Sequence, residues 1–142
     1  MSDVLVIIPT YNEIENISNI IETVMKYPDG FDVLVIDDSS PDGTAAAVEK
    51  LSEQYPGRVF LEKRAGKLGL GTAYIHGFKW ALAKDYAYVI EMDADFSHNP
   101  DDLTRLYHNC KDNAADVTIG SRYITGVNVV NWPMGRVLMS YF

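Results

Sequence analysis

The chain has 142 residues, of which 47% are hydrophobic, and its 20 acidic and 12 basic side chains give a net charge of −8. This length suits one domain with a buried core, and the acidic balance argues against nucleic-acid binding, which usually needs a basic face. The single cysteine, Cys110, excludes an internal disulfide and a thiolate metal cluster, and it fits a reducing compartment. No apolar run approaches the ~18 residues of a membrane span, and the N-terminus does not read as a signal peptide.

Strands and helices are predicted to alternate along the first half of the chain. The continuous apolar run 4–8 is typical of a strand covered on both faces. Asn12 and Glu15 form a capping-box pattern for the helix that follows. Its apolar residues recur at helical spacing, at Ile14, Ile17, Ile21 and Val24. Residues 33–36 form a second buried strand, and the next helix ends at Pro56.

The second half of the chain continues this alternation. A third strand is predicted at 59–61, a fourth at 86–92 and a fifth at 117–119. A glycine-rich loop and a helix separate the third strand from the fourth, and a helix at about 100–109 separates the fourth from the fifth. The pattern predicts one α/β domain over residues 1–142, with a mainly parallel sheet, right-handed crossovers and helices on both faces. We expect the C-terminal part of this domain to be missing.

Polar residues gather where four of the predicted strands end, at 9–13, 37–43, 93–95 and Arg122. Ligands of such sheets bind at the carboxyl ends of the strands. The second cluster begins with two adjacent carboxylates, Asp37 and Asp38. They repel each other unless a cation or hydrogen-bond donors contact them, and a nucleotide base or ribose supplies such donors. The first cluster also suits an ordinary helix N-terminus, so each cluster alone is weak evidence. Their shared edge predicts a binding site.

The triplet Asp93-Ala94-Asp95 directly follows the fourth predicted strand. Mg²⁺ prefers one or two protein carboxylates, with water and phosphate oxygens in its other positions. A metal held in this way can bind a diphosphate and stabilise it as a leaving group. His76 and His98 are interpreted as packing or surface residues, so the two aspartates are the expected metal ligands.

The glycine-rich loop is not a recognised phosphate-binding motif. Gly66, Gly69 and Gly71 do not fit G-x-G-x-x-G, because Tyr74 stands where the third glycine belongs. The loop also follows the third strand and lacks the order of a P-loop. A loop that approaches a nucleotide, or moves over it, accounts for these glycines.

Several segments resemble the family 2 glycosyltransferases, which have the GT-A fold. Residues 6–13, 35–44 and 93–98 carry this resemblance, and 67–77 and 120–123 are similar to the dolichol-phosphate (polyprenyl-phosphate) mannosyltransferase group. The resemblance runs in order along essentially the whole chain. It implies a Rossmann-like GT-A fold and an inverting enzyme that transfers mannose from GDP-mannose to a polyprenyl or dolichyl phosphate.

The resemblance also implies roles for individual residues. The nucleotide sugar would contact Pro9, Tyr11, Glu13, Ile36, Asp38, Asp93, Ala94 and Asp95. A divalent metal, Mg²⁺ or Mn²⁺, would be held by Asp93, Asp95 and Ser97, the last standing where prokaryotic members often have glutamine. The acceptor phosphate would be bound by Arg122, Arg136 and Ser140. Catalysis would depend on Asp93, Asp95 and Arg122.

A lipid acceptor implies a protein that acts peripherally at a membrane surface, in the cytoplasm or on the cytoplasmic face of a membrane. We expect an anchor or partner subunit outside this chain.

Three alternative functions stay open at this point. A related enzyme could use UDP-glucose, because its nucleotide and metal residues would look much the same. A haloacid-dehalogenase-type phosphatase also has Asp-x-Asp after a strand, but on its first strand. A non-catalytic binding domain could keep the fold as a scaffold.

Overall fold

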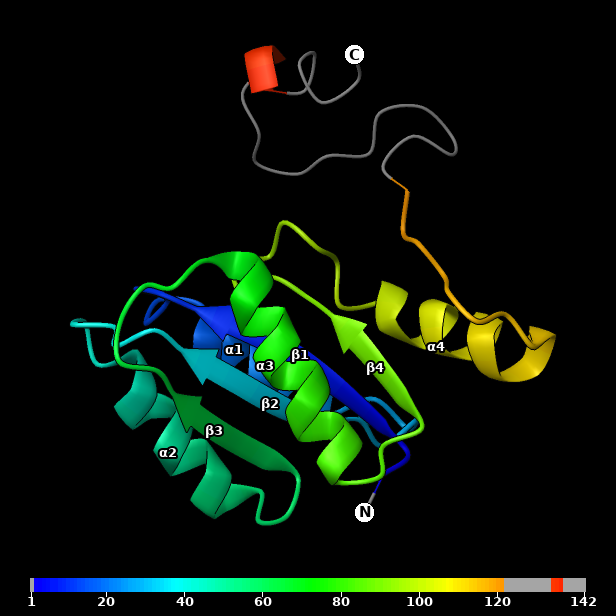
Figure 1. Ribbon diagram of the computed structural model, residues 1–142, viewed down its shortest axis with the longest axis horizontal. Coiled ribbons are helices and arrows are strands. Elements are labelled where there is room, and N and C mark those ends of the chain that lie inside the picture. Colours follow the sequence, from blue (N-terminus) through cyan, green and yellow to red (C-terminus); the bar gives the residue numbers. More distant parts are fainter. Residues whose placement is uncertain (1, 122–133, 137–142) are drawn as a thin grey trace.

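The computed structural model describes residues 2–121 and 134–136. Strands and helices alternate along the chain in the order β1 (Val4–Thr10), α1 (Ile17–Met25), β2 (Asp32–Asp37), α2 (Thr44–Gln54), β3 (Val59–Lys63), α3 (Leu70–Ala83), β4 (Tyr88–Glu91) and α4 (Asp102–Asn113). The four strands pair in parallel in the order β3-β2-β1-β4 (Figure 1). The predicted parallel α/β sheet is therefore confirmed.

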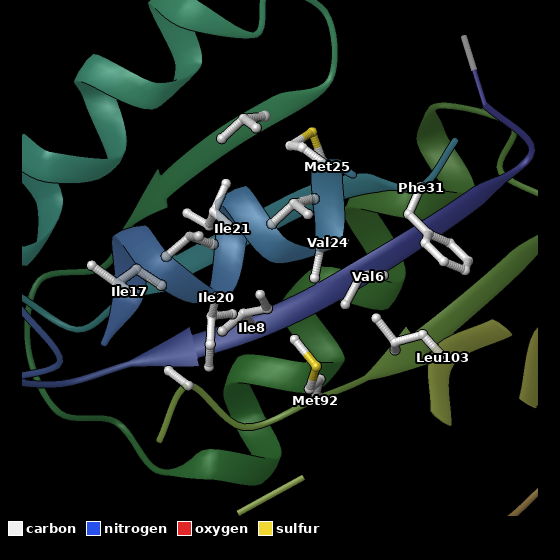
Figure 2. Packing of buried hydrophobic residues seen from close by; sticks show 14 of the residues in the cluster. Val6, Ile8, Ile17, Ile20, Ile21, Val24, Met25, Phe31, Met92 and Leu103 are labelled. Carbon is white, nitrogen blue, oxygen red and sulfur yellow. The ribbon is translucent and has the colours of Figure 1, made fainter. Parts of the chain in front are cut away.

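Helices cover both faces of the sheet, as the alternation predicted. Val6 and Ile8 of β1 pack in a large apolar cluster with residues of α1, α2 and α4, whereas Leu5 and Ile7 pack on the opposite face with residues of α3. Figure 2 shows the apolar side of α1 lying on β1. Successive residues of a strand point to opposite faces, so the continuous apolar run of β1 supplies both cores.

The helix after β1 begins later than the capping-box pattern predicts, and Asn12 is not its cap. Asn12 has a left-handed backbone with φ of 58°, and its N–H donates to Ser40 Oγ at 2.9 Å. The N–H of Ile14 donates to Asp42 Oδ2 at 3.1 Å. Because the loop after β2 takes these N–H groups, the chain does not enter α1 until Ile17.

The predicted strand at 117–119 is not formed. Val117 and Ile119 are 75% and 80% exposed, and the segment has no strand geometry. The side chain of Thr118 accepts a hydrogen bond from Asn109 Nδ2 at 2.8 Å, which ties the segment to α4. A strand needs a neighbouring strand to pair its backbone N–H and C=O groups. Residues 117–119 instead lie beside α4, to which Thr118 is hydrogen-bonded.

Candidate active site

Loops that follow β1, β2 and β4 meet at the carboxyl edge of the sheet. Together with the glycine-rich loop and first turns of α3, they enclose a pocket of about 230 Å³. Its lining comprises Pro9, Thr10, Tyr11, Glu13, Asp38, Lys67, Gly69, Leu70, Ala73, Asp93, Ala94 and Asp95. Seven of the eight residues expected to contact a nucleotide sugar thus line one pocket.

The other predicted site residues lie elsewhere. Ile36 is fully buried within β2 in the core beneath α3, and it does not line the pocket. Ser97 and the exposed Arg136 also do not line it. Arg122 and Ser140, predicted to bind the acceptor phosphate, lie outside the described residues.

The two carboxylates that end β2 have different partners. Asp37 Oδ1 accepts hydrogen bonds from Thr10 Oγ1 at 2.7 Å and from Ser40 Oγ at 2.6 Å. Asp38 receives both branches of the Arg64 guanidinium, Nε to Oδ1 at 2.6 Å and Nη2 to Oδ2 at 2.7 Å. The protein's own donors therefore relieve the expected repulsion. Asp37 holds β1 to β2, whereas Asp38 lines the pocket.

The loop after β4 is shaped by hydrogen bonds at both aspartates. Asp95 Oδ1 accepts the backbone N–H of Ser97 at 3.0 Å. The backbone N–H of Asp93 donates to His98 Nδ1 at 3.1 Å, and Tyr74 of α3 donates from its hydroxyl to Asp93 Oδ1 at 3.4 Å. His98, interpreted from the sequence as a packing or surface residue, holds this loop in shape.

Backbone strain collects in the same three loops. Five described non-glycine residues have positive φ, and three of them are Asn12 after β1, Ser39 after β2 and Phe96 after β4, with φ of 58°, 56° and 60°. Such conformations cost on the order of 1 kcal/mol each and persist only where surrounding contacts enforce them. Their grouping marks this edge as one whose geometry is fixed at the expense of local stability.

The pocket carries an excess of negative charge. Burial raises the pKa of Glu13 above its ordinary value, and the charges of Asp95, Asp42 and Asp93 raise it further against an opposing hydrogen bond with Asn16. Burial acts in the same direction on Asp95, but hydrogen bonds from Ser97 outweigh it and lower the pKa of that carboxyl. The folded protein thus favours the ionised form of Asp95 and disfavours that of Glu13.

These residues fit a divalent cation that shares its coordination with a ligand. Within residues 2–121 and 134–136, no three His, Cys, Asp or Glu side chains converge as a complete set of metal ligands. Asp93 and Asp95 offer two carboxylates, and Mg²⁺ commonly takes one or two, with phosphate and water completing its shell. Burial is the largest cause of the raised pKa of Glu13, and the aspartate charges that add to it are ones that a cation would offset.

Sequence reasoning assigned no role to two basic residues of this site. Arg64 directly follows β3 and its side chain is 7% exposed beside Asp38. Lys67 lines the pocket, with its ammonium 4.8 Å from the centre of the Tyr11 ring, a cation–π contact. Arg64 carries no motif or periodicity, and the partner that it meets lies 26 residues away in the chain.

Comparison with known sequences identifies a family and several relatives. The profile of glycosyl transferase family 2 matches residues 5–142. Polyprenol monophosphomannose synthase of Mycolicibacterium smegmatis is 48% identical over 96% of this chain and 51% of its own length. Undecaprenyl-phosphate mannosyltransferase of Micrococcus luteus is 44% identical over 97% of this chain and 56% of its own. Dolichol-phosphate mannosyltransferase of Pyrococcus furiosus is 40% identical over 96% of this chain and 38% of its own. The chain thus spans about half the length of the first two.

Solved structures share the fold. One is the mannosyltransferase PcManGT from Pyrobaculum calidifontis, solved in complex with GDP-Man and Mn²⁺. The match covers 66% of this chain and 27% of the PcManGT chain, with a TM-score of 0.54 and 31% sequence identity. TarS 1–349 of S. aureus matches 82% of this chain and 34% of its own with a TM-score of 0.61 and 24% identity. The second likeness concerns the fold alone. Both support the GT-A architecture expected from the sequence.

Proposed function

Because this chain belongs to glycosyl transferase family 2, we propose that the full-length protein transfers mannose from GDP-mannose to a polyprenyl phosphate, such as dolichyl phosphate. The observation that carries the proposal is the pocket in which Asp38, Asp93 and Asp95 meet. Of three relatives at 40–48% identity, one is named for the synthesis of polyprenol monophosphomannose and two are named as mannosyltransferases of undecaprenyl phosphate and dolichol phosphate. A neighbour of 31% identity was solved with GDP-Man and Mn²⁺.

The sheet order supports an orientation for the donor. Asp38 follows β2 and the two metal-binding aspartates follow β4, on either side of β1. Neighbouring strands lie about 4.8 Å apart, so these groups are about 10 Å from each other. We assign the nucleoside to the Asp38 side and the diphosphate to Asp93 and Asp95. Tyr11 and Glu13, at the end of β1, line the space between them.

The reaction needs little acid–base chemistry from the protein. An oxygen of the lipid phosphate attacks the anomeric carbon of mannose while the bond from that carbon to the diphosphate oxygen breaks, which inverts the configuration. The electron pair leaves with GDP. Asp93 and Asp95 would hold a divalent cation, which when bound would supply positive charge against the departing diphosphate. The acceptor phosphate is already anionic near neutral pH, so alignment of the two substrates is the main task of the pocket.

The acceptor half of the site is assigned to residues near the end of the chain. Arg122, Arg136 and Ser140 would hold the lipid phosphate, since a guanidinium can donate to two phosphate oxygens at once. None of the helices in residues 2–121 or 134–136 is long and apolar enough to cross a membrane. We propose that the reaction takes place at the cytoplasmic face of a membrane, with peripheral attachment of the protein, because its acceptor is a lipid phosphate.

A donor panel tests the proposal most directly. We expect GDP-mannose with Mn²⁺ or Mg²⁺ to raise the melting temperature of the full-length protein more than UDP-glucose does, because nucleotide and metal share the pocket. The measurement is thermal unfolding with each donor, with metal and with EDTA. Equal shifts with and without metal, or no shift at all, would contradict the metal–diphosphate arrangement. A larger shift with UDP-glucose would show that UDP-glucose, and not GDP-mannose, is the preferred donor.

Removal of one metal-binding carboxylate tests catalysis. We expect Asp95→Ala to lower transfer to a polyprenyl phosphate by at least about 100-fold, the usual loss when a group that stabilises developing charge is removed. Glu53→Ala is the control, because Glu53 is exposed on α2 at the opposite edge of the sheet. Near-normal turnover in Asp95→Ala would rule out its role.

A further inference from the structure

The buried side chain of Arg64 has partners in two separate segments of the chain. Both branches of its fork donate to the Asp38 carboxylate. Its Nη1 donates to Thr72 Oγ1 at 2.8 Å, and its Nη2 donates to the carbonyl of Gly69 at 3.1 Å. Its backbone N–H donates to the carbonyl of Asp37 at 2.8 Å. One residue after β3 thus connects the end of β2 to the start of α3.

Fold stability alone does not explain a buried pair of this kind. Desolvation of two charges consumes most of their attraction, and apolar residues of similar volume often stabilise a fold as well or better. What the fork provides is orientation, because two parallel hydrogen bonds fix the plane of the carboxylate. A carboxylate has about four acceptor positions. Arg64 takes one on each oxygen, so further positions remain for a ligand in the pocket that Asp38 lines.

The other side-chain contacts of Arg64 hold the glycine-rich loop in its conformation. Gly69 has a left-handed backbone with φ of 100°, and its carbonyl accepts hydrogen bonds from both Arg64 and Thr72. This loop carries Lys67, whose ammonium lies over the ring of Tyr11 at the pocket wall. The guanidinium that orients Asp38 therefore also fixes the segment that places Lys67.

We propose that Arg64 is the positioning residue for the nucleoside end of the donor. It presents the free acceptor positions of Asp38 to two N–H or O–H donors of the nucleoside, and it holds the glycine-rich loop so that Lys67 covers the pocket. The inference rests on the proposed function, since it assumes a nucleoside diphosphate donor. Arg64 lies beyond Asp38 at the nucleoside end, on the side away from Asp93 and Asp95.

The experiment measures binding and kinetics of the full-length protein. Calorimetry with GDP and with UDP, in the presence of Mn²⁺, compares wild type with Arg64→Lys, which keeps the charge and loses the fork. We expect Arg64→Lys to weaken GDP binding about tenfold or more, as is usual for partners that orient a binding group. The KM for GDP-mannose should rise by the same factor, with smaller changes in kcat and in the KM for the lipid phosphate.

A double-mutant cycle shows whether Arg64 acts through Asp38. In the Asp38→Asn background, adding Arg64→Lys should weaken GDP binding clearly less than the roughly tenfold loss expected in the wild-type background, because the oriented carboxylate is already gone and only the loop contacts of Arg64 are left to lose. Arg58→Lys is the matched control. Arg58 Nε lies 3.6 Å from Oδ1 of the buried Asp32 at the opposite edge of the sheet. This variant should therefore cost some stability and leave GDP affinity within about twofold of wild type.

Three results would overturn the inference. The first is wild-type GDP affinity in Arg64→Lys, and the second is full additivity of the Arg64 and Asp38 effects. If Arg64→Lys fails to fold, Thr72→Val is the second variant. It leaves the fork on Asp38 intact and removes the contact with Arg64 Nη1 together with the hydroxyl's own hydrogen bonds to the carbonyls of Leu68 and Gly69, so it should weaken GDP about fivefold. Unchanged affinity in Thr72→Val is the third. If wild-type protein binds neither GDP nor UDP, the proposed function fails, and this inference fails with it.

Discussion

At the scale of single residues, the pocket gathers carboxylates whose negative charges repel one another. Glu13 is the clearest case, because burial and the neighbouring aspartates together raise its pKa. A raised carboxyl pKa means that the folded state disfavours the ionised form, so an ionised Glu13 lowers stability at neutral pH. Functional sites often keep such arrangements at a cost in stability.

The variant Glu13→Gln should therefore melt at a higher temperature than wild type at pH 7 in EDTA. Between the ordinary pKa of 4.5 and the raised value, folded wild-type protein binds more protons than the unfolded chain does. Wild type then gains stability as the pH falls through this window, and the difference between the proteins should disappear below it. Thermal unfolding from pH 4 to pH 8 measures this. A variant that melts lower at pH 7 would contradict the account.

At the scale of elements, α3 is the single helix that packs on its face of the sheet within the described part of the chain. The close approach depends on Gly77, which is buried in the middle of the helix. A Cβ added there would lie 2.8 Å from two side-chain carbons of Ile7 and 3.1 Å from Ile36 Cδ1. Glycine is a poor helix former, so its place here reflects packing.

Gly77→Ala should destabilise the protein. Overpacking of a well-filled core costs about 1–3 kcal/mol, and the gain in helix propensity returns about 1 kcal/mol. We expect a net loss of about 1 kcal/mol, read from urea denaturation of the full-length protein. Gly71→Ala is the matched control in the same helix, since nothing lies within 4 Å of its added Cβ, and it should be neutral or slightly stabilising. Equal effects of the two variants would refute the packing argument.

At the scale of the whole molecule, regular alternation of apolar segments made the parallel sheet and the clusters at its carboxyl edge predictable. Contacts between distant segments were not. The loop after β2 takes the N–H groups of residues 12 and 14 and delays α1. Arg64 meets Asp38 only after the chain has folded, and Ile36 lies in the core although Asp38, two residues later, lines the pocket. Local patterns therefore predict elements, and tertiary contacts decide where helices begin and which side chains meet.

The charge of the whole chain gives a final test of the site. With a net charge of −8, general repulsion should be relieved by any salt, because screening acts on all exposed charges over about 8 Å at 0.15 M. NaCl should therefore raise the melting temperature of this 142-residue chain and of every charge variant of it alike. Mn²⁺ at millimolar concentration and constant ionic strength should raise it further only where Asp93 and Asp95 are both intact.

The decisive comparison uses two double variants that each remove two negative charges. Asp93→Asn with Asp95→Asn should lose the Mn²⁺ effect and keep the NaCl effect. Glu53→Gln with Asp85→Asn neutralises exposed residues at the edge where the strands begin, and it should keep both effects. If Mn²⁺ stabilises the two variants equally, the cation acts through overall charge, and the Asp93–Asp95 pair has no special affinity for it.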